Sequence, residues 1–247
     1  MQELLPNYAK LGDINALLNV KGFCILDTSR VIKWTHCSKE ELDDLSTAWA
    51  ALPKDKYLKD GGHYRRRRHS SFIFENNSLT QVAHRAHWQP LDYNALHGGI
   101  KRLFEPVLQA TTSKPAWHKV ICTLARTASE LHGNINAKWC IEAHQFRIDT
   151  TDGIGRPTPE GAHRDGVDFV AVFMVARKGI KGGETRVFEA SGPIGERFTL
   201  NESWSLLFLD DRRVIHESTP IQPFNEEGYR DTLVITLREN HFQNPAD

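Results

Sequence analysis

The stretch PEGAHRDG at residues 159–166 decides both the fold and the chemistry that we expect of this chain. Alternate side chains of a strand leave the same face, so His163 and Asp165 could hold one ion from adjacent corners. His216, which ends the run VIH at residues 214–216, would supply a third ligand. Two imidazoles and one carboxylate on one side of an ion, with other positions open, suit non-haem Fe(II) in oxygen chemistry. The sequence therefore predicts a metal centre at these three residues.

A His-x-Asp pair alone is a weak sign, because 12 His and 15 Asp in 247 residues give about 0.7 such pairs by chance. The context of the pair strengthens it. The pair lies just before an apolar run of strand type, and His216 lies on a later run of the same type. Arg230 and Thr232 begin the run after that, and on a strand they share a face. A guanidinium and a hydroxyl placed together predict an anchor for a carboxylate.

Residues 138–240 are predicted to form a β core. Short runs rich in Val, Ile, Phe, Leu and Thr predict strands at residues 139–148, 168–177, 184–188, 203–209, 214–218 and 231–238. Six strands at this spacing indicate a sandwich or barrel. Upstream we predict helices at residues 13–18, after the capping box of Ser38 and Glu41, at residues 100–108 and at residues 115–131. The chain is thus expected to be one domain, residues 1–247, mainly β with flanking helices, in which residues 1–137 form a mostly helical buttress that also covers the substrate.

Composition limits the partners. Lys and Arg balance Asp and Glu at 31 each, so there is no electrostatic case for nucleic acid or an acidic membrane. No apolar stretch approaches the roughly 18 residues of a membrane span. The four cysteines show no C-x-x-C spacing, and the first residues lack a basic start followed by an apolar run. We therefore expect a cytoplasmic protein with free thiols and a small-molecule substrate, and the sequence leaves a homodimer open.

Four consecutive arginines, residues 65–68, flow into the apolar run FIF at residues 72–74. This continuity and the neutral chain favour a strand over a nucleic-acid patch. Alternation would place Tyr64 and Arg66 on one face and Arg65 and Arg67 on the other. One face could then hold a carboxylate-bearing ligand, but the sequence does not say which.

The chain resembles the 2-oxoglutarate/Fe(II)-dependent dioxygenases, in particular the bacterial group that hydroxylates free L-amino acids such as isoleucine. The similarity covers most of the chain from about residue 56 onward, at residues 64–68, 93–94, 98–100, 104–106, 144–147, 157–161, 163–169, 182–185, 209–214, 216 and 229–231. It implies a double-stranded β-helix (jelly roll, cupin-like) core, Fe(II) on His163, Asp165 and His216, and 2-oxoglutarate on Arg230.

The resemblance also implies an activity. With O₂, such an enzyme decarboxylates 2-oxoglutarate to succinate and CO₂ and hydroxylates an aliphatic C–H, here of an isoleucine- or leucine-like free amino acid. Two departures, His69 after the arginine run and Glu217-Ser218 after the distal histidine, suggest a pocket for another side chain. The sequence does not identify the amino acid, the carbon attacked, or whether sulfoxidation also occurs.

A free amino acid needs a cation for its carboxylate and an acceptor for its ammonium. Our candidates are Gln145 and Arg147, which share a face of one predicted strand, with Tyr64, Arg66 and Asp168 behind them. Two alternatives remain at this stage. The same chemistry could act on a peptide or protein side chain, or the barrel could bind a metal and an anion without oxygenation.

Overall fold

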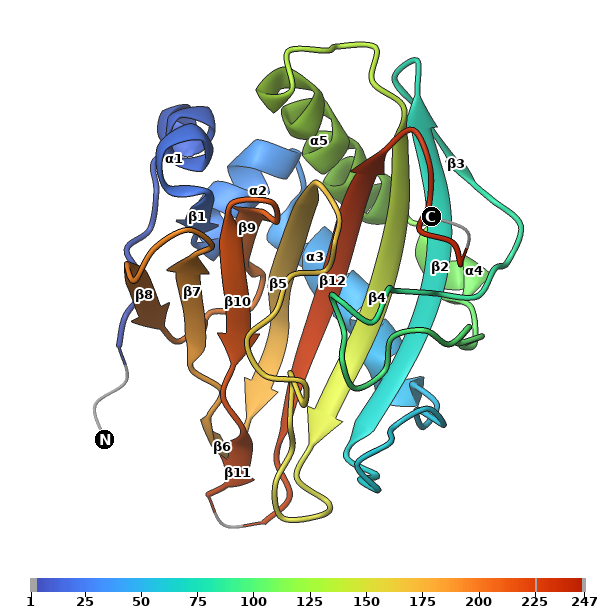
Figure 1. Ribbon diagram of the computed structural model, residues 1–247, viewed down its shortest axis with the longest axis vertical. Helices are drawn as coiled ribbons and strands as arrows, with labels where there is room; N and C mark the ends of the chain where they lie inside the picture. Colours follow the sequence, from blue (N-terminus) through green and yellow to red (C-terminus); the bar gives the residue numbers. More distant parts are fainter. Residues whose placement is uncertain (1–3, 225, 246–247) are drawn as a thin grey trace.

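The computed structural model describes residues 4–224 and 226–245, and its centre is a large antiparallel sheet (Figure 1). This major sheet has seven strands in the order β1-β9-β5-β12-β4-β2-β3. Their bounds are β1 Phe23–Leu26, β2 Arg65–Glu75, β3 Ser78–Gln81, β4 Trp139–Asp149, β5 Phe169–Lys178, β9 Ser205–Asp210 and β12 Tyr229–Glu239. Every pairing in it is antiparallel.

Two smaller sheets form the second layer of strands. One has the order β10-β7-β8 and the other the order β11-β6. Their strands are β6 Ile180–Gly182, β7 Thr185–Glu189, β8 Gly195–Phe198, β10 Val214–Ser218 and β11 Ile221–Pro223. A buried apolar cluster joins the layers, with Val172 and Leu207 from the major sheet and Val187 and Val214 from the smaller one. The predicted β-sandwich is confirmed as a jelly-roll core, and all six predicted strands are present.

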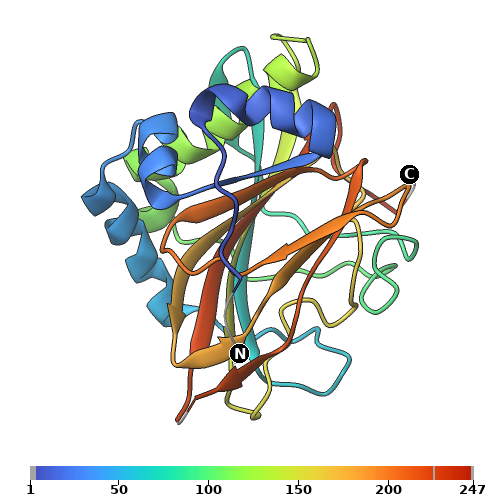
Figure 2. The ribbon, with the colours of Figure 1, turned by 90° about the vertical axis from the view of Figure 1, so that its left-hand side faces the viewer.

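The helices cover the opposite face of the major sheet (Figure 2). They are α1 Ile14–Lys21, α2 Thr28–Thr35, α3 Lys39–Ser46, α4 Gln109–Thr112 and α5 Pro115–Leu131, with 3-10 turns at Leu11–Asp13 and Thr47–Ala51. The capping box of Ser38 and Glu41 begins α3 as predicted. Helix α5 has Pro115 in its first turn and buries Val120, Ile121 and Leu124. Together these helices enclose the larger apolar core.

Two upstream predictions are corrected by the structure. Residues 100–108 form no helix, because Pro106 lacks the N–H that a helix needs and the segment instead runs along β2. There the His69 N–H donates to the Glu105 carbonyl, and the Val107 N–H donates to Ser70 Oγ. The first half is also more than a helical buttress, since it supplies β1, β2 and β3 of the major sheet. Among the described residues, no helix is both long and apolar enough to cross a membrane.

Candidate active site

His163 and Asp165 lie in the loop before β5, and their prediction as strand residues is wrong. His163 makes only a single β-bridge, to His216 on β10. The backbone N–H of His163 donates to the His216 carbonyl at 3.1 Å, and the N–H of His216 donates back at 2.9 Å. This reciprocal pair joins the loop to the smaller sheet. The two imidazoles consequently lie 4.8 Å apart between ring centroids.

The three side chains converge with the geometry of a shared ion. His163 Nε2 is 3.9 Å from one Asp165 oxygen, and His216 Nε2 is 3.8 Å from the other. These separations are too long for hydrogen bonds. Two ligand atoms that each lie about 2.0–2.2 Å from one metal ion, however, can be roughly 3–4 Å apart. The Nδ1 of His163 is 2.9 Å from the Gly161 carbonyl. Because a carbonyl can only accept, Nδ1 carries the proton and Nε2 has the lone pair that a metal requires.

The electrostatics of the triad also suit a cation. Burial, helped by His163, holds the pKa of His216 well below its usual range, so that imidazole is neutral. Burial alone would lower the pKa of His163, but the carboxylates of Asp165 and Glu160 outweigh it and raise that pKa. Burial raises the pKa of Asp165, against the opposing effect of His163. A buried carboxylate that is costly to ionise gains stability from a bound cation.

Asp211 holds the metal loop in shape. Its carboxylate accepts the backbone N–H groups of Asp165 at 3.0 Å, Gly166 at 2.7 Å and Val167 at 3.1 Å. Burial, together with the nearby charge of Asp165, raises the pKa of Asp211 to about 7. Gly166 has φ +76°, and a Cβ there would lie 2.5 Å from the Tyr93 ring. The loop geometry thus depends on a carboxylate and a glycine close to the ligands.

Gln89 contacts the side chain of Asp165, whereas Asp211 contacts its backbone. Its amide Nε2 donates to Asp165 Oδ1 at 3.0 Å. Its carbonyl oxygen accepts from Arg102 at 2.9 Å and from Asn94 at 3.2 Å. One side-chain amide therefore connects a metal ligand to a buried arginine.

A cavity of about 120 Å³ lies between the two layers of strands, beside the triad. Its walls come from β2, β4, β5, β10, β12 and the segments around residues 87–102 and 157–165: Arg65, Arg67, His87, Asn94, Arg102, His144, Phe146, Ile148, Pro157, Thr158, Glu160, His163, Asp165, Val172, His216, Ser218, Arg230, Thr232, Val234 and Thr236. The predicted anchor residues, Arg230 and Thr232, are therefore in the same cavity as the triad.

Arg230 fits an anion that the protein itself does not supply. Its side chain is buried, and its Nε has no hydrogen bond among the described residues. Burial, with a smaller contribution from Arg177, lowers the pKa of Arg230 to about 10, so the guanidinium still carries its charge at neutral pH. Such a buried cation gains most from a carboxylate held by two hydrogen bonds. 2-Oxoglutarate offers that carboxylate.

The structure also decides which arginines of the run face the cavity. Opposite the inward residues of β4, Arg65 pairs with Ile148 and Arg67 with Phe146, and both arginines line the cavity. Asp55 lies 2.7 Å from Arg65 Nε and 4.0 Å from Arg67. Arg66 points to the other side, where its Nε is 3.3 Å from Asp149.

The other four predicted substrate residues also lie outside the cavity walls. Gln145 and Arg147 share a face as predicted, but it is the helix-covered face of β4. There Arg147 forms a bidentate pair with Asp231, at 2.8 and 2.7 Å. Tyr64 donates to Asp60 and packs in a small apolar cluster with Ile148.

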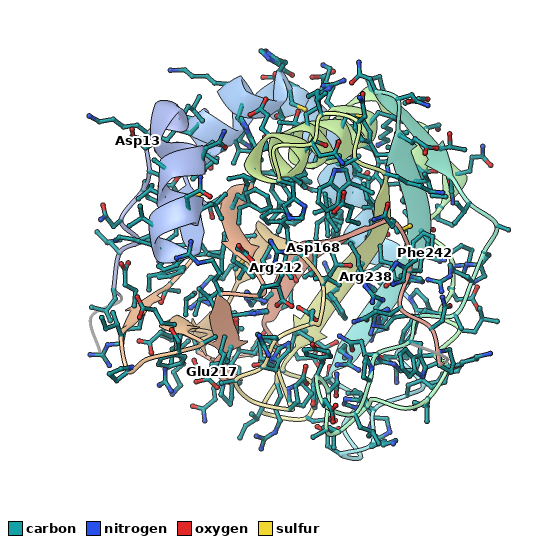
Figure 3. All side chains as sticks on the ribbon, turned by 45° about the horizontal axis from the view of Figure 1, so that its top comes forward. Asp13, Asp168, Arg212, Glu217, Arg238 and Phe242 are labelled. Atoms are coloured by element: carbon teal, nitrogen blue, oxygen red, sulfur yellow. The ribbon has the colours of Figure 1, made fainter. Side chains whose placement is uncertain are left out.

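Asp168 lies at the start of β5, beyond the metal loop. Its Oδ1 is 3.4 Å from the Arg212 guanidinium, and Figure 3 shows the two side chains together at the surface. Its Oδ2 accepts the backbone N–H of Glu239 at 2.8 Å. These contacts make Asp168 a link between strand ends, and it is not among the residues that line the cavity.

The fold and the site define a class, the jelly-roll oxygenases with two histidines and one carboxylate for non-haem iron. The chain belongs to the 2OG-Fe dioxygenase family, whose model matches residues 46–236. Enzymes of this family use Fe(II), 2-oxoglutarate and O₂, and His163, Asp165 and His216 form a candidate iron site.

Solved structures share this fold. A bsmA homolog from Methylobium petroleophilum PM1 is 47% identical, with a TM-score of 0.92 and 98% of each chain covered. IDO from Bacillus thuringiensis is 16% identical, with a TM-score of 0.69, covering 94% of this chain and 100% of that one. The Fe(II)/(alpha)ketoglutarate-dependent dioxygenase TqaL is 17% identical, with a TM-score of 0.72 and coverage of 92% and 86%. The latter two support the fold alone. No curated protein matches the chain.

Proposed function

We propose that this protein hydroxylates an aliphatic C–H of a free L-amino acid about the size of isoleucine or leucine, while 2-oxoglutarate is converted to succinate and CO₂. The observation that carries this proposal is a pair of opposite, incompletely bonded charges in the cavity. Arg65 Nη2, Arg67 Nε and Arg102 Nε are buried without a hydrogen bond among the described residues, and so is Glu160 Oε2.

A free amino acid carries the matching charges. Its carboxylate would take the unused donors of these arginines, and its ammonium would donate to Glu160. Glu160 is close to the metal site, since its Oε1 lies 3.6 Å from His163 Nε2. A substrate held there would have its α-carbon end close to the triad. A residue inside a peptide has neither a free carboxylate nor a free ammonium on its α-carbon. The arginines and Glu160 together therefore favour a free amino acid.

The covering segment favours a small substrate as well. Residues 87–102, which we call the covering segment, form one wall of the cavity through His87, Asn94 and Arg102. The backbones of His87 and Arg102 pair with each other in both directions. A peptide would need an open groove through this wall. The four free cysteines agree with the proposed location in a reducing cytoplasm.

The residues of this chain would then divide the work. Iron, when bound by His163, Asp165 and His216, supplies the activation of O₂ with 2-oxoglutarate as the reductant. Arg230 and Thr232 would hold 2-oxoglutarate from β12. Arg65, Arg67, Arg102 and Glu160 would fix the amino acid, while the covering segment excludes water from the reacting C–H.

The test is succinate formation from 2-oxoglutarate with Fe(II) and ascorbate, screened across the twenty amino acids and a set of short peptides. We expect stimulation by a single class of free amino acid and an added mass of 16 in that amino acid. Stimulation by peptides alone would transfer the same chemistry to a peptide side chain and contradict the proposal. No succinate with any compound would favour a metal- and anion-binding protein without oxygenase activity.

A further inference from the structure

A second cluster of histidines and a carboxylate lies in the wall of the same cavity. It consists of His69 on β2, His87 in the covering segment, and Glu142 and His144 on β4, all of them buried. Glu142 is its centre: Oε1 is 3.0 Å from His69 Nε2, and Oε2 is 3.1 Å from His87 Nδ1. The His144 ring stacks on His69, with centroids 4.7 Å apart.

The composition of the cluster resembles a metal site, but its contacts do not. The Arg67 guanidinium lies 2.7 Å from His144 Nδ1. A guanidinium can only donate, so it occupies the lone pair through which His144 would bind a metal. Arg85 lies 3.4 Å from Glu142 and supplies a positive charge for this carboxylate. A divalent ion would therefore meet two cations and only one ionised ligand.

The same contacts fix the position of each ring proton. Glu142 is ionised and only accepts, so His87 donates from Nδ1. Burial lowers the pKa of His87 to about 4, so the ring is neutral and its Nε2 is an acceptor. For His144 the order is reversed. Its Nδ1 accepts from Arg67, so its Nε2 carries the proton and is a donor.

Both of these rings line the cavity, whereas His69 and Glu142 lie behind them. Their centroids are 4.7 Å apart at an interplanar angle of 76°. In both rings the protein uses Nδ1, through Glu142 for His87 and through Arg67 for His144, which leaves Nε2 for a ligand. The cavity wall therefore carries one ring with a free acceptor nitrogen and one ring with a free N–H donor, and the two rings are neighbours.

We propose that His87 and His144 determine side-chain specificity by holding a group that both donates and accepts hydrogen bonds, such as a hydroxyl or a primary amide. The preferred substrate is then a free amino acid with a polar neutral side chain, and the enzyme hydroxylates an aliphatic carbon of that amino acid. This inference rests on the proposed function. An aliphatic side chain of the same shape would cover both nitrogens without replacing their contacts with water, which costs affinity.

Isosteric pairs of amino acids test the inference, because the two members differ in polarity and hardly in shape: threonine against valine, and asparagine against leucine. Binding is measured by calorimetry on the protein loaded with Fe(II) and 2-oxoglutarate without O₂, and turnover is measured as succinate with O₂. We expect the polar member of at least one pair to bind about tenfold more tightly, the effect of about one hydrogen bond.

His87→Asn is the informative variant. The asparagine amide can take the place of Nδ1 and keep the hydrogen bond to Glu142, but it has no atom at the position of Nε2. We expect the polar preference to fall about tenfold while the binding of 2-oxoglutarate is unchanged. His144→Asn likewise retains an acceptor for Arg67 and removes the cavity donor. His132→Asn is the control, since His132 contacts Glu239 away from the cavity.

The outcomes separate this inference from the function on which it rests. Binding of leucine or valine as tight as that of its polar isostere would overturn the inference and leave the amino acid hydroxylase intact. Binding of no amino acid of either kind would overturn both. A second equivalent of Fe(II) or Zn²⁺ per chain, lost in His87→Asn, would also overturn it, because the cluster would then be a metal site.

Discussion

Arg230→Met tests the anion anchor with little risk to the fold. The guanidinium is buried beside Arg177, and the two charges repel each other, so removing one does not destabilise the native state electrostatically. Methionine fills a similar volume along β12. What is lost is the pair of charge-assisted hydrogen bonds to the far carboxylate of 2-oxoglutarate. At about 1.5–3 kcal/mol each, the two bonds sum to about 3–6 kcal/mol, a loss of roughly 10²–10⁴-fold in affinity.

The assay is the concentration of 2-oxoglutarate that half-saturates succinate formation, together with calorimetric binding in the absence of O₂. Arg66→Met is the matched control. It removes an arginine from β2 that faces away from the cavity toward Asp149. We expect the control to keep the normal requirement. If Arg230→Met keeps the melting temperature and the 2-oxoglutarate requirement of the unaltered protein, Arg230 is not the anchor for 2-oxoglutarate.

Three further predictions concern the triad, the amino acid and pH. His163→Ala should lose bound iron, measured by metal analysis, at an unchanged circular dichroism spectrum, because two ligands remain at an open site; stoichiometric iron in the variant would contradict the triad. Glu160→Gln should raise the half-saturating amino acid concentration roughly 10- to 100-fold, the effect of one charge-assisted bond, with the 2-oxoglutarate requirement as the internal control. The free energy of unfolding should fall as pH drops from about 6.5 to 4: the pKa of His87 is about 4 in the fold and near 6.5 when unfolded, so the native state resists a proton that the unfolded chain accepts. The contribution of His87 is about 3 kcal/mol, and urea titrations should show a shallower pH dependence in His87→Asn; equal slopes would place the sensitivity elsewhere.

The parts of the fold that sequence could predict are those with strong local signals. The capping box before α3, the proline at the start of α5 and the apolar runs of β4, β5 and β12 all appear where the pattern places them. The segment at residues 100–108 shows the limit. Its apolar spacing resembles a helix, but its hydrogen bonds go to β2, a partner about 37 residues earlier that no local pattern reveals.

The site divides in the same way. The convergence of His163, Asp165 and His216, and the presence of Arg230 in the same cavity, could be predicted because these residue types are unusual at the ends of apolar runs. The inward face of β4 could not be predicted, because this strand is buried on both faces and carries polar side chains on each. Glu142 and His144 lie on the cavity side, whereas Gln145 and Arg147 lie on the helix-covered side with the apolar core. Alternation then gives two faces without saying which is inward. Gln89 and Arg102 lie in irregular segments, where only the folded chain brings them to Asp165.

The alternation along β2 has a consequence for how this protein can diverge. Arg65 and Arg67 face the cavity, whereas Arg66 and Arg68 do not. Four identical residues in a row therefore lie in two different environments. Deleting one residue from the strand would turn its inner face outward, exchanging buried cations for surface ones. Relatives should therefore change length here only at the ends of β2, and a lysine should be tolerated at position 66 far better than at position 67.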